Sequence, residues 1–226
     1  SGGQNLQIGC SGNGTLYQTG GTATCGGWPV VGRFGGGSGV YTLEGGAFNQ
    51  TASGTGRQII GENGTGTLNV RGSGVAHLVG GLKLAAGSGG VGTVTLGAGG
   101  TINTPIVEKG SGSSATFNFN GGVLRARASG AVITNYMQGL NAANVLAGGA
   151  VIDSSNSTVT VAQNLASGAT PDGGLTKLGT GSLLLSGSNS YNGPTTVSNG
   201  VLRIASTNAV PAGSAVAVRG GTLDLG

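Results

Sequence analysis

The sequence has few ionisable side chains, and this scarcity excludes a class of partner. Only 7% of its 226 residues are charged, against about a quarter in ordinary soluble domains. Ten Lys and Arg residues give a net charge of +4, but they are scattered and have no aromatic residues interleaved with them. A nucleic-acid-binding surface needs a basic patch or stripe. We therefore expect no nucleic-acid partner.

Histidine and cysteine are too scarce to build a metal centre or a catalytic triad. His77 is the only histidine, and Cys10 and Cys25 are the only cysteines. Structural zinc takes four Cys or His ligands, and a serine hydrolase needs a histidine beside its nucleophile. We expect no metal, no cofactor and no catalytic residue. The cysteines predict a disulfide suited to an oxidising exterior, with two small buried hydrophobic side chains as the alternative.

Long apolar runs are absent as well. No stretch of 18 apolar residues occurs, which argues against a transmembrane helix. The first residues lack the basic and apolar regions of a signal peptide, and residues 222–226 stop within a strand-like pattern. We interpret the chain as a fragment of a longer protein.

Glycine is what the chain has in excess. It contributes 52 residues, against five prolines, and no Gly-X-Y period runs through it, which excludes a collagen helix. Hydrophobic residues make up 37% of the chain and alternate with Thr, Ser and Asn, so a core can form. We expect the glycines at corners, where the backbone needs positive φ angles.

A repeat of about 25 residues is the main structural signal. Five strand-like segments begin at residues 15, 40, 67, 93 and 116, in steps of 25, 27, 26 and 23 residues. Apolar Leu68 and Val70 alternate with polar Thr67 and Asn69, which is typical of a half-buried strand. Shorter apolar runs lie between the segments, at residues 29–32, 58–61, 82–84 and 105–107. Each repeat therefore holds at least two strands.

A unit of this length cannot bury its own apolar face, but coils stacked about 4.8 Å apart share a continuous core. This predicts an all-β fold, a right-handed parallel β-solenoid of about nine coils, with a β-sandwich second. We expect one continuous domain over residues 1–226. It comprises regular coils over 1–127, an irregular excursion with a short helix or loop over 128–172, and shorter coils over 173–226. In these last coils three apolar pairs should point inward: Leu183 with Leu185, Leu202 with Ile204, and Leu223 with Leu225.

Residues 173–204 carry the most specific motif, which reads GGLTKLGTGSLLLSGSNSYNGPTTVSNGVLRI. It closely resembles the autotransporter-associated β-strand repeat, and residues 37–112 look like the glycine-rich repeats of such proteins. The resemblance implies a β-helical passenger exported to the bacterial cell surface, with an outer-membrane anchor elsewhere in the parent chain. In that family the repeat serves secretion and rod-building, and it carries no catalytic residue to transfer.

These observations favour a structural or adhesive extracellular protein over an enzyme. The alternative is a polysaccharide-binding or polysaccharide-degrading β-helix protein. Degradation would need carboxylates paired about 5 to 9 Å apart. The chain has six scattered acids, which are Glu44, Glu62, Glu108, Asp153, Asp172 and Asp224.

The candidate surface contacts are aromatic and basic. We expect host or environmental glycans to contact Tyr17, Tyr41 and Trp28, together with flat faces made of Thr, Ser and Asn side chains. Arg125 and Arg127 stand two residues apart and should share a face that could bind an anionic glycan. The other partner is the protein itself, because an uncapped solenoid end presents unpaired strand edges from which fibres can grow.

Two further features have structural explanations. Tyr191 should pack at a corner against a neighbouring coil instead of stacking on a ligand. The Thr-x-Thr pairs at residues 93–95 and 158–160 would suit an ice-binding face, but they do not repeat in register.

Overall fold

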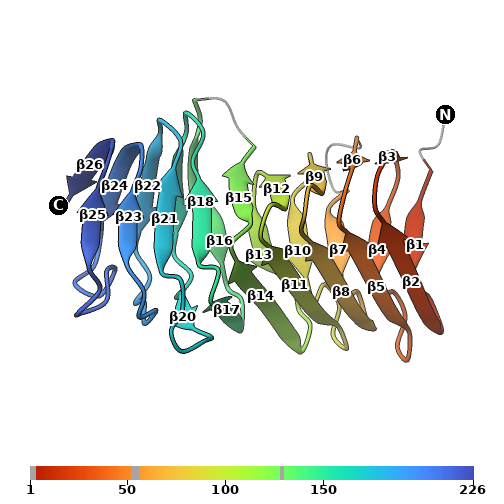
Figure 1. The fold of residues 1–226 in the computed structure, drawn as a ribbon. Helices are drawn as coiled ribbons and strands as arrows, with labels where there is room; N and C mark the ends of the chain where they lie inside the picture. The colour runs from red at the N-terminus through yellow and green to blue at the C-terminus, as the bar shows by residue number, and fades with distance from the viewer. Residues whose placement is uncertain (1–3, 52–55, 128–129) are drawn as a thin grey trace.

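The computed structural model describes residues 4–51, 56–127 and 130–226. These residues form 26 β-strands and no helix, so the described part of the chain has no helix that could cross a membrane. The strands wind into a rod that advances from the N-terminal end to the C-terminal end (Figure 1). The predicted all-β class is confirmed.

Three parallel sheets form the sides of the rod. Sheet A has ten strands: β1 (Leu6–Ile8), β4 (Pro29–Val31), β7 (Gln58–Ile60), β10 (Leu82–Leu84), β13 (Val107–Lys109), β16 (Val132–Gln138), β19 (Thr158–Val161), β22 (Ser182–Leu185), β24 (Gly200–Ile204) and β26 (Gly221–Asp224). Sheet B has seven: β2 (Asn13–Gln18), β5 (Ser38–Leu43), β8 (Thr65–Val70), β11 (Val91–Gly97), β14 (Ser114–Asn120), β17 (Ala142–Val145) and β20 (Ala166–Ser167). Sheet C has nine: β3 (Thr22–Cys25), β6 (Ala47–Gln50), β9 (Val75–Leu78), β12 (Thr101–Thr104), β15 (Val123–Ala126), β18 (Ala150–Asp153), β21 (Leu175–Leu178), β23 (Thr195–Val197) and β25 (Val216–Val218). This is the predicted parallel β-solenoid of about nine coils.

The repeat alignment gives the strand register of sheet B correctly. Thr15 pairs with Val40, Val40 with Thr67, Thr67 with Thr93, and Thr93 with Thr116. The predicted steps are therefore the true coil lengths in this part of the rod. Each of these coils contains a third strand, from sheet C, in addition to the two that the sequence pattern required.

The core runs without a break through the stacked coils. Inward side chains from all three sheets form one hydrophobic cluster that extends from Ile8 to Ala209. Large rings fill its N-terminal and central parts: Tyr41 and Phe48 pack edge to face, and Phe117 lies 4.6 Å from Phe119 between ring centroids. Because each coil is too thin to enclose a core, this burial depends on both neighbouring coils.

Residues 130–172 correct the expectation of an irregular excursion with a short helix or loop. Strands β16 to β20 join the three sheets as ordinary members of the stack. The irregularity is a register shift in β16 between Ile133 and Met137, where extra residues bulge out of the pairing with β19. Residues 128–129, which begin the predicted excursion, lie outside the described part of the chain.

The C-terminal coils are shorter, as the leucine spacing predicted. Leu183 pairs with Leu202, and Leu202 with Leu223. Leu183 and Leu202 are fully buried, whereas Leu223 is half-buried. Leu225 was wrongly expected to point inward: it follows β26 and is 73% exposed.

Candidate functional surfaces

Sheet B presents a face without charge. Its seven strands contain no Asp, Glu, Lys, Arg or His residue. Outward positions carry mostly hydroxyl and amide groups, because period-two alternation sends the apolar residues into the core. The face therefore combines a regular strand spacing with electrical neutrality over several coils.

Hydrogen bonds connect the polar side chains of this face from coil to coil. One row contains Thr42, Asn69, Thr95, Asn118 and Asn144 in register. Asn69 donates to the Thr42 hydroxyl at 3.2 Å, and Asn144 donates to the Asn118 carbonyl oxygen at 2.9 Å. These bonds restrict the side-chain rotamers. By contrast, the Thr-x-Thr pair at residues 158–160 lies in sheet A, so it forms no common row with residues 93–95.

Two of the three aromatic residues singled out from the sequence are exposed. Tyr17 lies on the outer face of β2 and is 54% exposed, whereas Trp28 precedes β4 and is 37% exposed. They belong to different sides of the rod. Tyr41 was wrongly expected at the surface: it pairs with Leu16 and Leu68 on the inward side and donates its hydroxyl to Gln18 Oε1 at 2.5 Å.

Arg125 and Arg127 are both exposed, and their spacing places them on one face of sheet C. The charge of Arg125 is not free, because its Nε lies 2.7 Å from Asp153 Oδ2. This ion pair weakens the attraction that the two arginines were expected to exert on an anionic glycan.

The cysteines are free thiols, which corrects the disulfide prediction. Cys25 Sγ donates to the carbonyl oxygen of Gln4, and Cys10 Sγ donates to Gln7 Oε1. Gln4 precedes β1, whereas Gln7 lies within this strand, so the two sulfur atoms have different hydrogen-bond partners. A disulfide needs Cα atoms roughly 4 to 7 Å apart.

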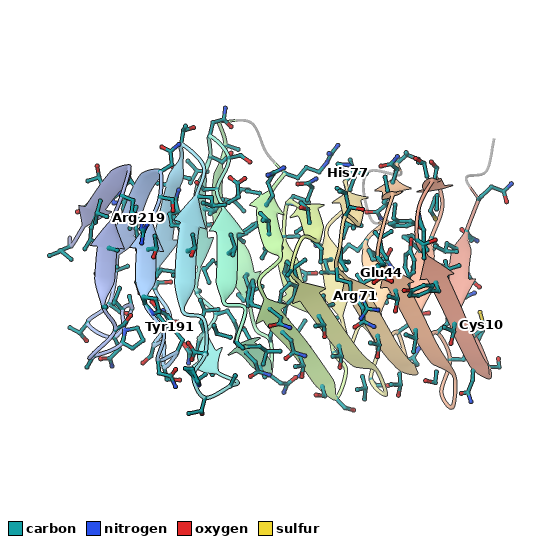
Figure 2. The ribbon with its side chains drawn as sticks, viewed as in Figure 1. Cys10, Glu44, Arg71, His77, Tyr191 and Arg219 are labelled. Atoms are coloured by element: carbon teal, nitrogen blue, oxygen red, sulfur yellow. The ribbon has the colours of Figure 1, made fainter. Side chains whose placement is uncertain are left out.

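Each of the six carboxylates has a cationic or a backbone partner. The ion pairs are Glu44 with Arg71 at 3.4 Å (Figure 2), Glu62 with Arg33 at 3.4 Å, Glu108 with Arg57 at 3.2 Å and Lys83 at 3.1 Å, Asp153 with Arg125 at 2.7 Å, and Asp224 with Arg203 at 2.9 Å. Asp172 is held by backbone N–H groups. Within the described residues, no cluster of His, Cys, Asp and Glu could hold a metal ion.

Asp172 connects two coils and directly precedes residues 173–204, the segment that resembles the autotransporter-associated β-strand repeat. Its carboxylate accepts N–H bonds from Gly174 (3.0 Å), Asn192 (2.8 Å) and Gly193 (2.7 Å). Burial raises the pKa of this carboxyl, but the backbone bonds and Ser167 outweigh burial and hold the pKa below its usual value. A glycosidase acid needs a raised pKa, so Asp172 is suited to structure.

Lys177 is a buried cation that was not predicted from the sequence. It is fully buried and pairs in register with Ile152 and Val197, which are core residues. Its ammonium group donates to the carbonyl oxygens of Leu178, Gly179 and Asn199 at 2.7, 2.8 and 3.1 Å. The signal was its parity with Leu175, which marks an inward position. Lys177 thus connects the corner after β21 to the next coil.

Tyr191 packs inside the rod, as expected. It is buried, and its hydroxyl lies 2.6 Å from Thr195 Oγ1. Asn189 bridges coils: its Oδ1 accepts from the Leu165 N–H and its Nδ2 donates to the Ala209 carbonyl. His77 lies in β9, with Nδ1 2.9 Å from Asn103 Nδ2. These groups stabilise stacked coils.

The comparison with protein families agrees with this arrangement. Residues 175–204 match the family model described as passenger-associated-transport-repeat, the segment in which the sequence resemblance was found. They include β21 to β24 and the buried side chains of Lys177 and Tyr191. The chain matches no curated protein and no solved structure. The chain is therefore a parallel β-solenoid whose residues 175–204 match the passenger-associated-transport-repeat, and this combination fits a passenger-type scaffold.

Proposed function

We propose that the chain is a structural and adhesive rod of an extracellular bacterial surface protein, without enzymatic activity. The observation that carries this proposal is the unbroken stacking of parallel coils around one core. Because each coil adds only to the length of the stack, a protein of this kind forms a rod of constant width that can project from a cell surface. The transport repeat supports export to the cell surface. The pairing of every carboxylate argues against a polysaccharide-degrading site.

Association between rods proceeds through sheet B, where the partner is another copy of the chain. Charge keeps proteins soluble and monomeric, and the strands of sheet B carry no charged side chain. Its laddered amides and hydroxyls can bond to the same groups on a second rod. Such contacts would assemble rods into fibres.

Electron microscopy and sedimentation velocity of the purified chain test this proposal. We expect single rods at low concentration and lateral assemblies at high concentration. Replacing Thr93→Lys and Thr116→Lys places two charges on adjacent coils of sheet B and should keep the rods single. Thr176→Lys, at a half-exposed position of sheet C, is the matched control and should assemble normally. Single rods at every wild-type concentration would refute the assembly.

A further inference from the structure

Exposed aromatic residues occur at only one end of the rod. The chain has four Phe, four Tyr and one Trp, all of them described. Six of these rings are buried, namely Tyr41, Phe48, Phe117, Phe119, Tyr136 and Tyr191. The exposed ones are Tyr17, Trp28 and Phe34, with Phe34 45% exposed. Because the rest of the rod buries its rings, the exposure within residues 17–34 calls for a functional explanation.

Trp28 and Phe34 form a cluster with Arg33 at the ends of β4. The Arg33 Cζ atom lies 4.8 Å from the Trp28 ring centroid and 4.6 Å from the Phe34 ring centroid. The guanidinium therefore contacts both rings by cation–π attraction. We call Trp28, Arg33 and Phe34 the aromatic–arginine cluster.

Neighbouring coils fix this cluster from both sides. Arg33 Nη1 donates to Gln7 Oε1 on β1 at 2.9 Å, and Arg33 Nε lies 3.4 Å from Glu62 Oε2 beyond β7. The Trp28 backbone N–H donates to Asn5 Oδ1 at 2.7 Å. A site whose side chains are already held loses little conformational entropy when a ligand binds.

A small apolar layer lies on the same outer face of sheet A. Val30 and Ile59 pair in register with Gln7 and Lys83, so they point away from the core, and neither belongs to the core cluster. They are nevertheless only 0% and 8% exposed. Other atoms therefore cover this part of sheet A, where Trp28 and Arg33 flank β4.

The chemistry of the cluster determines which ligand fits. Glu62 neutralises Arg33, so the cluster offers no unpaired charge for an anion. Three side chains are far smaller than the roughly 800 Å² per partner of a stable protein interface. A pyranose has apolar C–H faces that pack on aromatic rings, and hydroxyls that can bond to Arg33, Gln7 and Glu62.

We propose that the aromatic–arginine cluster binds a neutral pyranose residue of a glycan. This inference deepens the adhesive part of the proposed function and rests on it. It assigns glycan contact to the outer face of sheet A at the N-terminal end, whereas association between rods uses sheet B.

Trp28 is the only tryptophan, so its fluorescence reports on this site alone. The full chain would be titrated with neutral cellohexaose, maltohexaose and mannohexaose, and with acidic hexagalacturonate. We expect a saturable change in emission with at least one neutral oligosaccharide, and an affinity that salt does not alter, because no net charge is involved. No saturable change with any neutral sugar, or tighter salt-sensitive binding of hexagalacturonate, would overturn the proposal.

Variants identify the residues responsible. Phe34→Ala should weaken binding by roughly tenfold, as loss of an aromatic anchor does, and Phe34→Leu replaces it if the alanine variant does not fold. Arg33→Lys keeps the charge but loses the planar contact, and should weaken binding several-fold. Tyr17→Ala removes an exposed ring on sheet B and should bind as the wild type does. Unchanged affinity in both Phe34 and Arg33 variants would refute the site.

The two proposals fail separately. The double variant Thr93→Lys and Thr116→Lys should retain sugar binding while losing assembly. For the wild-type chain, assembly without sugar binding would refute only the glycan site, whereas sugar binding without assembly would refute only the role of sheet B in fibres.

Discussion

Gly36 and Gly61 show two separate reasons why corners require glycine. Both have positive φ angles, +82° and +73°, but a Cβ atom at Gly36 would meet open space, whereas one at Gly61 would lie 2.1 Å from the Val91 carbonyl oxygen. Gly36→Ala should cost only the left-handed backbone penalty of about 1–2 kcal/mol. Gly61→Ala should cost about 1–3 kcal/mol more, since it also overpacks against the next coil. Denaturant unfolding measures both losses, and equal losses would contradict the close-contact argument.

Lys177 makes stability depend on pH in the alkaline range. Burial lowers its pKa from 10.5 to about 8, against the opposing effect of Asp153. Below pH 8 the folded and unfolded states both bind the proton. Between pH 8 and 10.5 only the unfolded state keeps it, so the free energy of unfolding should rise with pH across this window.

The matched control is Lys177→Met, which keeps a long side chain but cannot titrate. The difference in unfolding free energy between the wild type and this variant should shift in favour of the wild type from pH 8 to 10.5. Thermal or urea unfolding at several pH values measures it, and other titrations cancel in the difference. A flat difference would show that Lys177 does not release its proton in this range.

At the scale of elements, Asp172 joins the loop before β21 to the corner between β22 and β23. Asp172→Asn leaves one oxygen atom for bonds that two carboxylate oxygens accept, so we expect a loss of about 2 kcal/mol. Because the folded pKa is lowered, this contribution is present above the usual carboxyl pKa and is lost as the pH falls through the folded one. Asp224→Asn, at an exposed ion pair, should change stability little. Comparable losses would contradict the role of Asp172.

The strands of sheets A and B could be predicted because apolar alternation and glycine spacing repeat along the chain. The register follows from the same repeat, as the pairing of Thr67 with Thr93 shows. The strands β16 to β20 were harder to predict, because a bulge in β16 interrupts the alternation of apolar and polar residues locally, while the neighbouring coils still impose the strand pairing. Pairing with the neighbouring coils, and not the local sequence pattern, therefore determines the secondary structure of this region.

The candidate surfaces were only partly predictable, for physical reasons. The exposure of Tyr17 and Trp28 was predicted. The burial of Tyr41 could have been predicted only from its in-register alignment with Leu16 and Leu68, which point into the core. The contacts of Arg33 with Trp28 and Phe34 depend on a corner conformation, which no periodicity encodes. The free cysteines likewise follow from the coil geometry that separates their surroundings.

At the scale of the whole molecule, each coil contacts only the coils before and after it, so stability should be nearly one-dimensional. Among the described strands, β1 pairs only with β4 and β26 only with β24 in sheet A. Central strands β8, β11 and β14 have partners on both sides and bury Leu68, Val94 and Phe117. Hydrogen exchange should therefore be slowest in these central strands and should become faster toward both ends.

Phe117→Ala tests how far a local defect spreads. Removal of this fully buried ring should cost about 3–5 kcal/mol, because the two adjacent coils cannot close around the cavity. Hydrogen exchange should accelerate in β11, β14 and β17, which pair around Phe117, while β1 and β26 keep their wild-type rates. Acceleration by the same factor along the entire rod would instead mean that the solenoid unfolds as one cooperative unit, and the nearest-neighbour description of its stability would then be wrong.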